Sequence, residues 1–423
     1  MRLRNKPKII AFASIALLMV ALLLSSACAQ APPAAPEKTV KVGHIAFTTG
    51  PVADAGLPIS MNAVDWIRWT NEKYGGVEGV KIDYKWIDSG YEGPRSIAIY
   101  QRLKEWGAKI IWSFGTVPND AIMAMAQEDG MPIMAWGGDS SLYWPPNVFF
   151  ATYMGYAEEG RFGAVWLKNN VPGLPKIPKV AMIFSDDAFG WSTAHGPLYY
   201  EAEDGYEVVA HELLGHGALD ATTQVRNIMK AGADILVLHY TVGTNAVVVR
   251  DAIRLGFKGL IISTPQTLDY ALTELSEGAA EADNVYWMSY THLTEERLPA
   301  MEPIYEMLRT YYPNRDPYRP HSAKVWENGI IAPFAVVEGL RAAIKTYGYE
   351  NLTWANIIKG LETLNFPDVH GLAPLIFSPD DHRGNPNFCV FQLKGGEFKL
   401  VGDFERAPEP ADWEKQGKFK WAK

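Results

Sequence analysis

The chain has 423 residues, with 39 basic and 48 acidic side chains and a formal net charge of −9. This length is sufficient for two domains that each bury an apolar core. The acidic balance argues against a nucleic-acid-binding protein and against a basic membrane-binding surface.

Residues 1–28 predict a secretory leader. A basic head, Met1–Lys8, precedes an unbroken apolar run, Ile9–Leu24, and a small-residue exit, Ser25–Cys28. Such a segment is removed from the mature protein, and the run is short for a permanent membrane span. Without residues 1–27, 396 residues remain, with 35 basic and 48 acidic side chains and a net charge of −13. We therefore expect the mature protein outside the cytoplasm.

Two cleavage sites compete. Small residues before Cys28 are typical of a lipoprotein, in which this cysteine is acylated and becomes the mature N-terminus. Ser25 replaces the usual aliphatic residue three positions earlier, so ordinary cleavage after Ala27-Cys28-Ala29 is the alternative. The Pro- and Ala-rich residues 28–39 predict a stiff tether, which favours lipidation. Cys389, the other cysteine, lies in an apolar run and is interpreted as a small core residue.

From Val40 onward, β-rich runs alternate with helical patterns, which is typical of parallel sheets covered by helices. The first expected strands are Val40–Phe47, Val80–Ile87, Lys109–Phe114 and Pro132–Ala135, with helices at Ile59–Tyr74, Pro94–Trp106 and Asn119–Glu128. The next expected strands are Val180–Phe184, Glu207–His211, Ile235–His239 and Leu260–Ser263, with helices at Glu158–Asn169, Trp191–Glu203, Ala221–Lys230 and Asn245–Leu255. Two successive doubly wound units are expected.

The last part continues with helices and ends in a hairpin. The expected elements are strand Val285–Ser289, helices Met301–Tyr312, Glu327–Lys345 and Trp354–Leu364, and strands Phe388–Lys394 and Phe398–Val401. Residues 406–423 predict a charged surface tail.

Familiar catalytic motifs do not follow the expected strands. The chain has no G-x-S-x-G, P-loop or G-x-G-x-x-G at those places. His211 and His216 are five positions apart, whereas two zinc ligands on one helix face are four apart. Asp186 and Asp187 suit a turn and a helix N-cap better than acid–base catalysis. No catalytic residue, metal ligand or cofactor is predicted.

Loops rich in glycine, hydroxyls and aromatic rings follow the strands of both units. In open parallel sheets, ligands bind beyond the carboxyl ends of strands and at helix N-termini. Backbone N–H groups and hydroxyls suit a carboxylate, and aromatic rings supply an apolar wall. These loops are Gly115–Val117, Gly137–Ser140, Phe189-Gly190, Tyr240-Thr241 and Pro265-Gln266. Together with the resemblance described next, they give the predicted ligand-binding residues Thr116, Gly137, Gly138, Asp139, Ser140, Phe189, Tyr240, Thr241 and Gln266.

An ordered set of short segments resembles the leucine/isoleucine/valine-binding branch of the periplasmic solute-binding proteins, which deliver substrates to ABC importers. The segments are Val42-Gly43-His44-Ile45, Thr49-Gly50-Pro51-Val52-Ala53, Asn71-Glu72-Lys73-Tyr74-Gly75-Gly76-Val77, Gly79, Asp88, Glu128-Asp129-Gly130-Met131-Pro132, Asp187-Ala188-Phe189-Gly190 and Arg254-Leu255-Gly256-Phe257. The resemblance implies an α/β chain with the type I periplasmic-binding-protein fold, two doubly wound parallel-sheet lobes joined by three crossovers. Lobe one would comprise residues 40–154 and 291–372, and lobe two residues 155–290 and 373–405.

The resemblance also implies roles for the loops. Thr116 and the loop Gly137–Asp139 match the positions that hold a ligand carboxylate, and Phe189 and Tyr240-Thr241 match contacts in lobe two. Two departures matter. Asp139 replaces a hydroxyl residue, and the neutral Gln266 lies where the family has an acid for the ligand's ammonium group. Either Asp139 takes over the ammonium group, or the ligand has none and Asp139 accepts from an amide or hydroxyl.

The expected protein is a monomeric, lipid-anchored receptor in the periplasm or on the outer face of the membrane. It would capture a small amino acid or a related carboxylate or amide, pass it to the membrane permease of an ABC importer, and carry out no reaction on it. A ligand-sensing module for a signalling partner and an α/β hydrolytic enzyme are the alternatives.

Overall fold

The computed structural model describes residues 37–267, 282–318 and 325–409. The chain separates into two units, residues 1–38 and residues 39–423. The predicted leader, Cys28, most of the tether and most of the tail lie outside the described residues. None of the described helices combines the length and the apolarity needed to cross a membrane.

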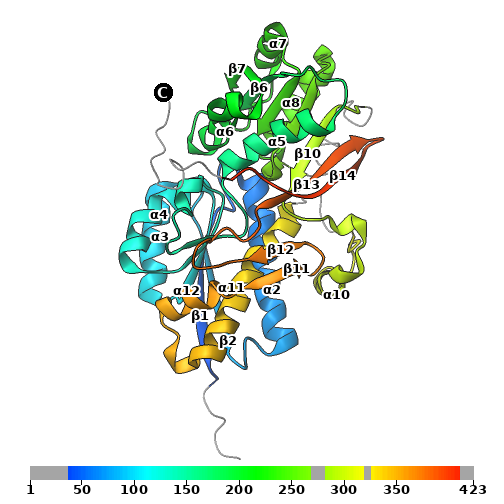
Figure 1. The fold of residues 1–423 in the computed structure, drawn as a ribbon. Coiled ribbons are helices and arrows are strands. Elements are labelled where there is room, and N and C mark those ends of the chain that lie inside the picture. The colour runs from blue at the N-terminus through cyan, green and yellow to red at the C-terminus, as the bar shows by residue number, and fades with distance from the viewer. Residues whose placement is uncertain (1–36, 268–281, 319–324, 410–423) are drawn as a thin grey trace, which may run out of the picture. The chain divides into compact units, whose positions relative to one another are not determined.

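The first sheet is parallel throughout, and most of it, except for the edge strand β2, is buried. Its strands are β1 (Thr39–Ala46), β2 (Lys81–Asp88), β3 (Ile110–Phe114), β4 (Ile133–Trp136) and β5 (Phe149–Ala151), in the order β2-β1-β3-β4-β5. Helices α2 (Ala53–Tyr74), α3 (Gly93–Trp106) and α4 (Thr116–Asp129) follow β1, β2 and β3 (Figure 1). Every residue of β3, β4 and β5 is buried, as expected for strands covered by helices on both faces.

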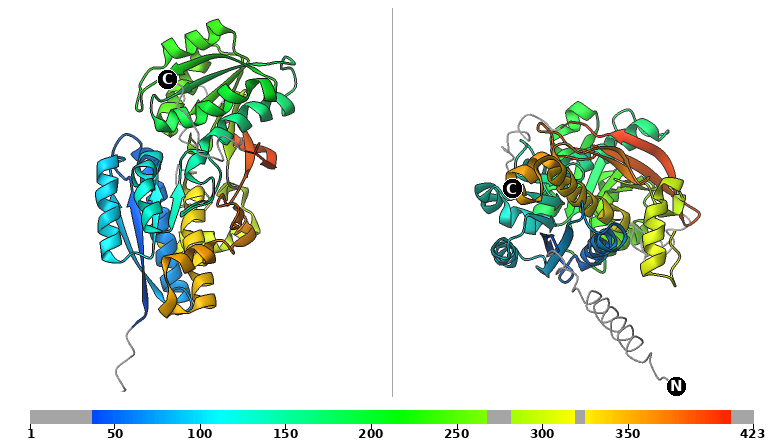
Figure 2. Two further views of the ribbon diagram at one scale, coloured as in Figure 1. Left: turned by 60° about the vertical axis from the view of Figure 1, so that its left-hand side comes forward. Right: turned by 90° about the horizontal axis from the view of Figure 1, so that it is seen from below.

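The second sheet has five parallel strands and an antiparallel hairpin. The strands are β6 (Lys179–Phe184), β7 (Glu207–Leu213), β8 (Ile235–His239), β9 (Leu260–Ser263), β10 (Val285–Ser289), β13 (Asn387–Lys394) and β14 (Glu397–Arg406), in the order β14-β13-β10-β9-β8-β6-β7. Its helices are α5 (Tyr156–Asn170), α6 (Ala188–Asp204), α7 (Thr222–Ala231) and α8 (Val242–Leu255), drawn in greens in Figure 2.

The chain passes between the sheets three times: after β5, after β10 and before β13. After β10 it forms α10 (Glu302–Tyr311), α11 (Val325–Tyr347), α12 (Trp354–Leu361) and the hairpin β11 (Asn365–Val369) and β12 (Ala373–Ile376). Helix α11 packs along α2 and against β3 and β4, so this segment belongs with the first sheet (Figure 1). The expected pair of doubly wound sheets is thereby confirmed, whereas the exact lobe boundaries stay a prediction.

Most expected elements are present, with shifted ends. Helix α2 ends at Gly75, which adopts the left-handed conformation with φ 73°, as its sequence predicts. The helix begins at Ala53 instead of Ile59, with Pro58 inside it. Strands β5, β11 and β12 were not expected, because β5 has only three residues and β11 and β12 each contain a proline, which argues against a strand.

Candidate functional site

All nine predicted ligand-binding residues are buried and follow the carboxyl ends of strands. Thr116 begins α4, and Phe189 lies in the first turn of α6. Thr241 is the N-cap of α8, and Gln266 lies in a short 3₁₀ helix, η2 (Pro265–Thr267), after β9. The loop after β4 contains Gly137 to Ser140. Both sheets therefore present these residues at the edge where open parallel sheets bind ligands.

Close approach of Tyr156 explains the glycine at position 137. Gly137 has φ 84°, and a Cβ there would lie 2.3 Å from the Tyr156 hydroxyl. The hydroxyls of Tyr91 and Tyr156 also lie near Thr116. Nevertheless, Thr116 Oγ1 has no hydrogen-bond partner of good geometry among the described residues. A buried hydroxyl in this condition is uncommon, because burying a polar group without a hydrogen bond costs free energy.

Asp139 both caps a turn and presents a second oxygen. Ser141 N–H donates to Asp139 Oδ1 at 2.9 Å, which caps the 3₁₀ helix η1 (Ser140–Leu142). Asp139 Oδ2 is buried and accepts no hydrogen bond of good geometry from the described residues. Burial raises the pKa of Asp139, while hydrogen bonding by Ser141 and by Ser192 of α6 opposes this rise. The carboxyl of a first-sheet loop thus meets a helix of the second sheet.

Two of the predicted residues use their hydroxyls within the protein. Ser140 Oγ donates to Glu158, and Arg383 Nη1 lies 3.0 Å from Glu158 Oε1. The Tyr240 hydroxyl donates to the Leu214 carbonyl at 2.7 Å. These contacts suit residues that position the surrounding loops.

Gln266 is held by an acid that the sequence analysis did not single out. Its Nε2 donates to Glu159 Oε1 and Oε2 at 3.1 and 3.0 Å and to the Tyr290 hydroxyl at 3.0 Å. Burial raises the pKa of Glu159 well above its ordinary value, and no lysine or arginine in the described part of the chain forms an ion pair with it. Gln266 Oε1 is buried and has no partner among the described residues. An acid is therefore present beside Gln266, contributed by α5.

Aromatic rings enclose these polar groups. Tyr153 stacks on Tyr290 with ring centres 3.7 Å apart, and Phe189 stacks on His239 at 3.9 Å. Tyr156 meets the Phe189 and His239 rings edge-on at 5.4 and 4.8 Å. Such stacks present large apolar faces at low conformational cost.

His239, the last residue of β8, is buried and neutral at physiological pH. Its Nδ1 lies 2.7 Å from the Thr264 hydroxyl, and its Nε2 has no hydrogen-bond partner of good geometry in the described residues. Burial lowers the pKa of His239 to about 3. The ring can therefore form one hydrogen bond with a ligand through Nε2, but it carries no charge.

The electrostatic character of the site is acidic. Asp120 of α4 is exposed, and partial desolvation of its carboxyl together with the nearby charge of Asp139 raises its pKa. Burial and the neighbouring Asp120, Glu159 and Asp139 charges raise the pKa of Tyr143. These acidic side chains together favour a ligand that offers hydrogen-bond donors or a positive charge.

Several residues of the site were missed from the sequence. His239 and Tyr153 lie at or just after strand ends, so the strand-end rule could have found them once β5 was recognised. Tyr156 and Glu159 lie in the first turn of α5, and no local motif marks them. Both residues lie on the crossover segment after β5, and only the folded chain brings this segment to the carboxyl ends of the strands.

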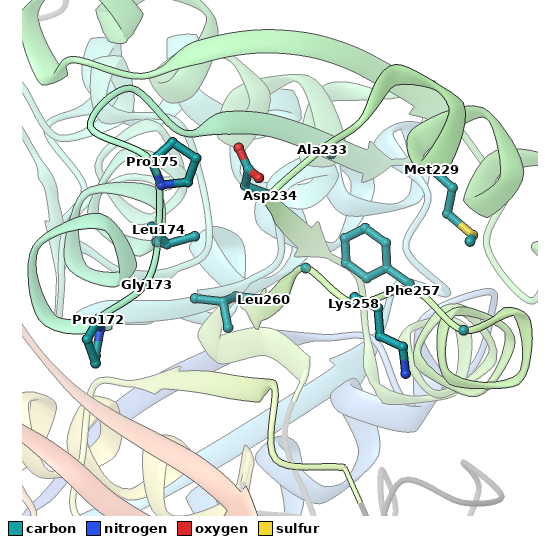
Figure 3. A pocket seen from close by; sticks show the side chains of 12 residues that line it. Pro172, Gly173, Leu174, Pro175, Met229, Ala233, Asp234, Phe257, Lys258 and Leu260 are labelled. Carbon is teal, nitrogen blue, oxygen red and sulfur yellow. The ribbon is translucent and has the colours of Figure 1, made fainter.

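A separate pocket lies at the opposite ends of the second-sheet strands. It has a volume of about 520 Å³ and is lined by the loop Pro172–Pro175, by Met229 and by residues 233–234 and 256–260 (Figure 3). Asp234 and Leu260 stand at the amino ends of β8 and β9. None of the predicted ligand-binding residues lines this pocket.

The chain belongs to the periplasmic binding protein family. The family pattern matches residues 39–397, which includes the first sheet and the second sheet from β6 through β13. The match covers most of the 423 residues, so it describes the chain as a whole.

Solved structures share the fold. A branched-chain amino acid ABC transporter protein from Thermus thermophilus with bound valine has 23% identity and a TM-score of 0.79, covering 88% of this chain and 97% of that one. A fatty acid ABC transporter substrate-binding protein from Thermomonospora curvata has 20% identity and a TM-score of 0.76, with coverage of 91% and 96%. A leucine-binding protein from Thermotoga maritima has 18% identity and a TM-score of 0.69, with coverage of 88% and 99%.

Proposed function

We propose that this protein is the extracytoplasmic solute receptor of an ABC importer and captures a small amino acid, or a related carboxylate or amide, between its two lobes. One observation carries this proposal. Thr116 Oγ1, Asp139 Oδ2 and Gln266 Oε1 are buried at the carboxyl ends of strands from both sheets, and none has a hydrogen-bond partner of good geometry in the described residues. A polar ligand held between the lobes would satisfy all three atoms.

The arrangement also favours certain ligand groups. Asp139 Oδ2 and Gln266 Oε1 are acceptors, so they suit an amino or amide N–H of the ligand. Thr116 Oγ1 and the backbone of Gly137 and Gly138 would receive a carboxylate or carbonyl oxygen. The stacked rings around Tyr153 and Phe189 would contact an apolar body. Valine, which is bound in the Thermus thermophilus structure, and the fatty acid named for the Thermomonospora curvata protein both have a polar head and an apolar body.

The first experiment identifies the ligand and then tests Asp139. A thermal-shift screen of small metabolites would find compounds that bind the folded state and raise the melting temperature. Titration calorimetry would then compare an amino-bearing ligand with its des-amino analogue. Loss of a charge-assisted contact costs about 1.5–3 kcal/mol, so Asp139→Ala should weaken the amino-bearing ligand by about tenfold to a hundredfold.

Asp139→Asn is the matched control for the capping role. Asparagine caps a turn about as well as aspartate, so this variant keeps the contact with Ser141 and removes the charge. We expect it to weaken amino-bearing ligands while the des-amino analogue and the unliganded melting temperature change little. If both variants bind every ligand as the wild type does, Asp139 is only a cap and the proposed site is wrong there.

We further propose that Cys28 anchors the receptor through a lipid at the outer face of the cell membrane. The support is the run of small residues before Cys28 and the Pro/Ala tether after it. Metabolic labelling with a fatty acid in a bacterial host should label the wild type and not Cys28→Ser. An unlabelled wild type whose mature chain begins at Gln30 would establish ordinary cleavage instead.

A further inference from the structure

Three potential metal ligands from distant parts of the sequence converge beside the second sheet. His292 follows β10, Cys389 lies in β13 and Asp403 lies in β14. One ligand atom of each residue lies within 4.8 Å of the other two. Imidazole, thiolate and carboxylate are the donor types that hold zinc in proteins.

The orientation of His292 matches that of a metal-binding histidine. Its Nδ1 lies 3.2 and 3.1 Å from Glu296 Oε1 and Oε2, which favours the tautomer with the proton on Nδ1. The lone pair of Nε2 then faces Asp403, whose Oδ1 is 3.5 Å away. Phe404 meets the imidazole ring edge-on at 5.0 Å and helps to hold it. A carboxylate on the second nitrogen is the usual support of zinc-bound histidines.

One of the three distances between the ligand atoms suits a tetrahedral ion. Zinc bonds of about 2.0–2.3 Å place neighbouring ligand atoms of a tetrahedron about 3.3–3.8 Å apart. The Nε2–Oδ1 distance of 3.5 Å lies in this range but is long for a hydrogen bond. The Asp403 side chain is 75% exposed, so it can move toward an ion without disturbing the core.

The surroundings give the site both rigidity and access. Cys389 is fully buried in β13 and is opposite Ser289 of β10 in the sheet register. Asp403, on the neighbouring strand, leaves one side open to solvent and provides an entry path. Three protein ligands leave the fourth tetrahedral position for a water molecule.

We propose that His292, Cys389 and Asp403 form a binding site for a divalent transition metal, with Zn²⁺ as the best match. The ion would join the loop after β10 to the β13–β14 hairpin. His292 N–H also donates to the Leu372 carbonyl at 2.8 Å, between β11 and β12. A bound ion would therefore restrain the connection that follows β10.

Cobalt spectroscopy and zinc calorimetry test the site directly. The parent protein is the full chain with Cys28→Ser, so that Cys389 is its sole thiol. Titration with Co²⁺ should produce a near-ultraviolet thiolate-to-cobalt charge-transfer band that saturates at one equivalent and disappears in Cys389→Ser. Zn²⁺ should displace the cobalt and raise the melting temperature.

Asp403→Asn and Asp380→Asn form the matched pair of variants. Both replace exposed carboxyls, but Asp380 lies outside the three-residue group, so only Asp403→Asn should weaken Zn²⁺ binding, by about tenfold or more. Because Asp403 is exposed, this variant stays folded even if Cys389→Ser does not. Absence of the charge-transfer band in the parent, or equal Zn²⁺ affinity in the two aspartate variants, would overturn the proposal.

Discussion

Asp186 and Asp187 are adjacent carboxylates with different structural roles. Gly190 N–H and the Ser185 hydroxyl donate to Asp187 Oδ1 at 3.0 and 2.6 Å, which caps α6 as the sequence predicts. Asp186, which is exposed, instead accepts from the indole of the half-buried Trp191. Asp187→Ala should lower the free energy of unfolding by about 1–2 kcal/mol, whereas Asp186→Ala, the matched control, should change it by about 0.5 kcal/mol or less. Urea denaturation of both variants measures the difference.

The stabilisation that Asp187 provides should decrease as the pH falls. Burial disfavours its charged form, but hydrogen bonds from His216, Ser185 and Gly190 outweigh burial and hold the pKa of Asp187 below the ordinary 3.8. A lowered folded-state pKa stabilises the protein above the unfolded value, and this stabilisation disappears as the pH falls through the folded value. The difference in the free energy of unfolding between wild type and Asp187→Ala should therefore be largest near pH 6 and should decrease below about pH 3.8. A gap that grows on acidification would contradict the assignment.

Single residues of the ligand site were partly predictable from the sequence. Thr116, Asp139 and Gln266 could be named because each follows a strand of the expected parallel sheets, where ligands bind. Glu159 could not, because nothing in its local sequence separates it from any acid in the first turn of a helix. The buried contact between Gln266 and Glu159 joins residues 107 positions apart, and such contacts are created only by the fold.

At the scale of elements, the sequence pattern located most helices and strands but missed the strands β5, β11 and β12. Helix α4 was expected from about Asn119, and it begins at Thr116 because Gly115, with φ 101°, turns the chain directly into the helix. This earlier start places Thr116 at a helix N-terminus. Strand β5 escaped notice because three residues cannot display alternation, yet it leads directly into Tyr153 and Tyr156. Strand β5 and the start of α4 were thus not predicted, and both position residues of the site.

At the scale of the whole molecule, contacts between the helices of the two sheets would contribute to ligand binding. Asp54 lies in the first turn of α2, and its Oδ2 accepts from Gly243 N–H in the first turn of α8 at 3.1 Å. A carboxylate beside two helix N-termini is favoured by both helix dipoles. The contact joins one helix of each sheet, so it can form only when the two lie close together.

We expect ligand binding and this contact to be coupled. In a receptor that closes around its ligand, the free energy of every closing contact contributes to affinity. Asparagine keeps an acceptor oxygen for Gly243 N–H but removes the charge that the helix dipoles favour, a term of about 0.3–1 kcal/mol, so Asp54→Asn should weaken ligand binding by about twofold to fivefold. Asp83→Asn, at an exposed site on β2, is the control and should bind as the wild type does.

Small-angle scattering distinguishes closure from a purely local effect. The wild type should show a smaller radius of gyration at saturating ligand than without it, because the lobes approach each other. Asp54→Asn should need more ligand to reach the same compact state and should show the same final radius. If the radius of the wild type stays constant at proven saturation, the ligand is not captured between lobes. If the radius falls but Asp54→Asn and Asp83→Asn bind alike, closure occurs without help from the Asp54–Gly243 contact.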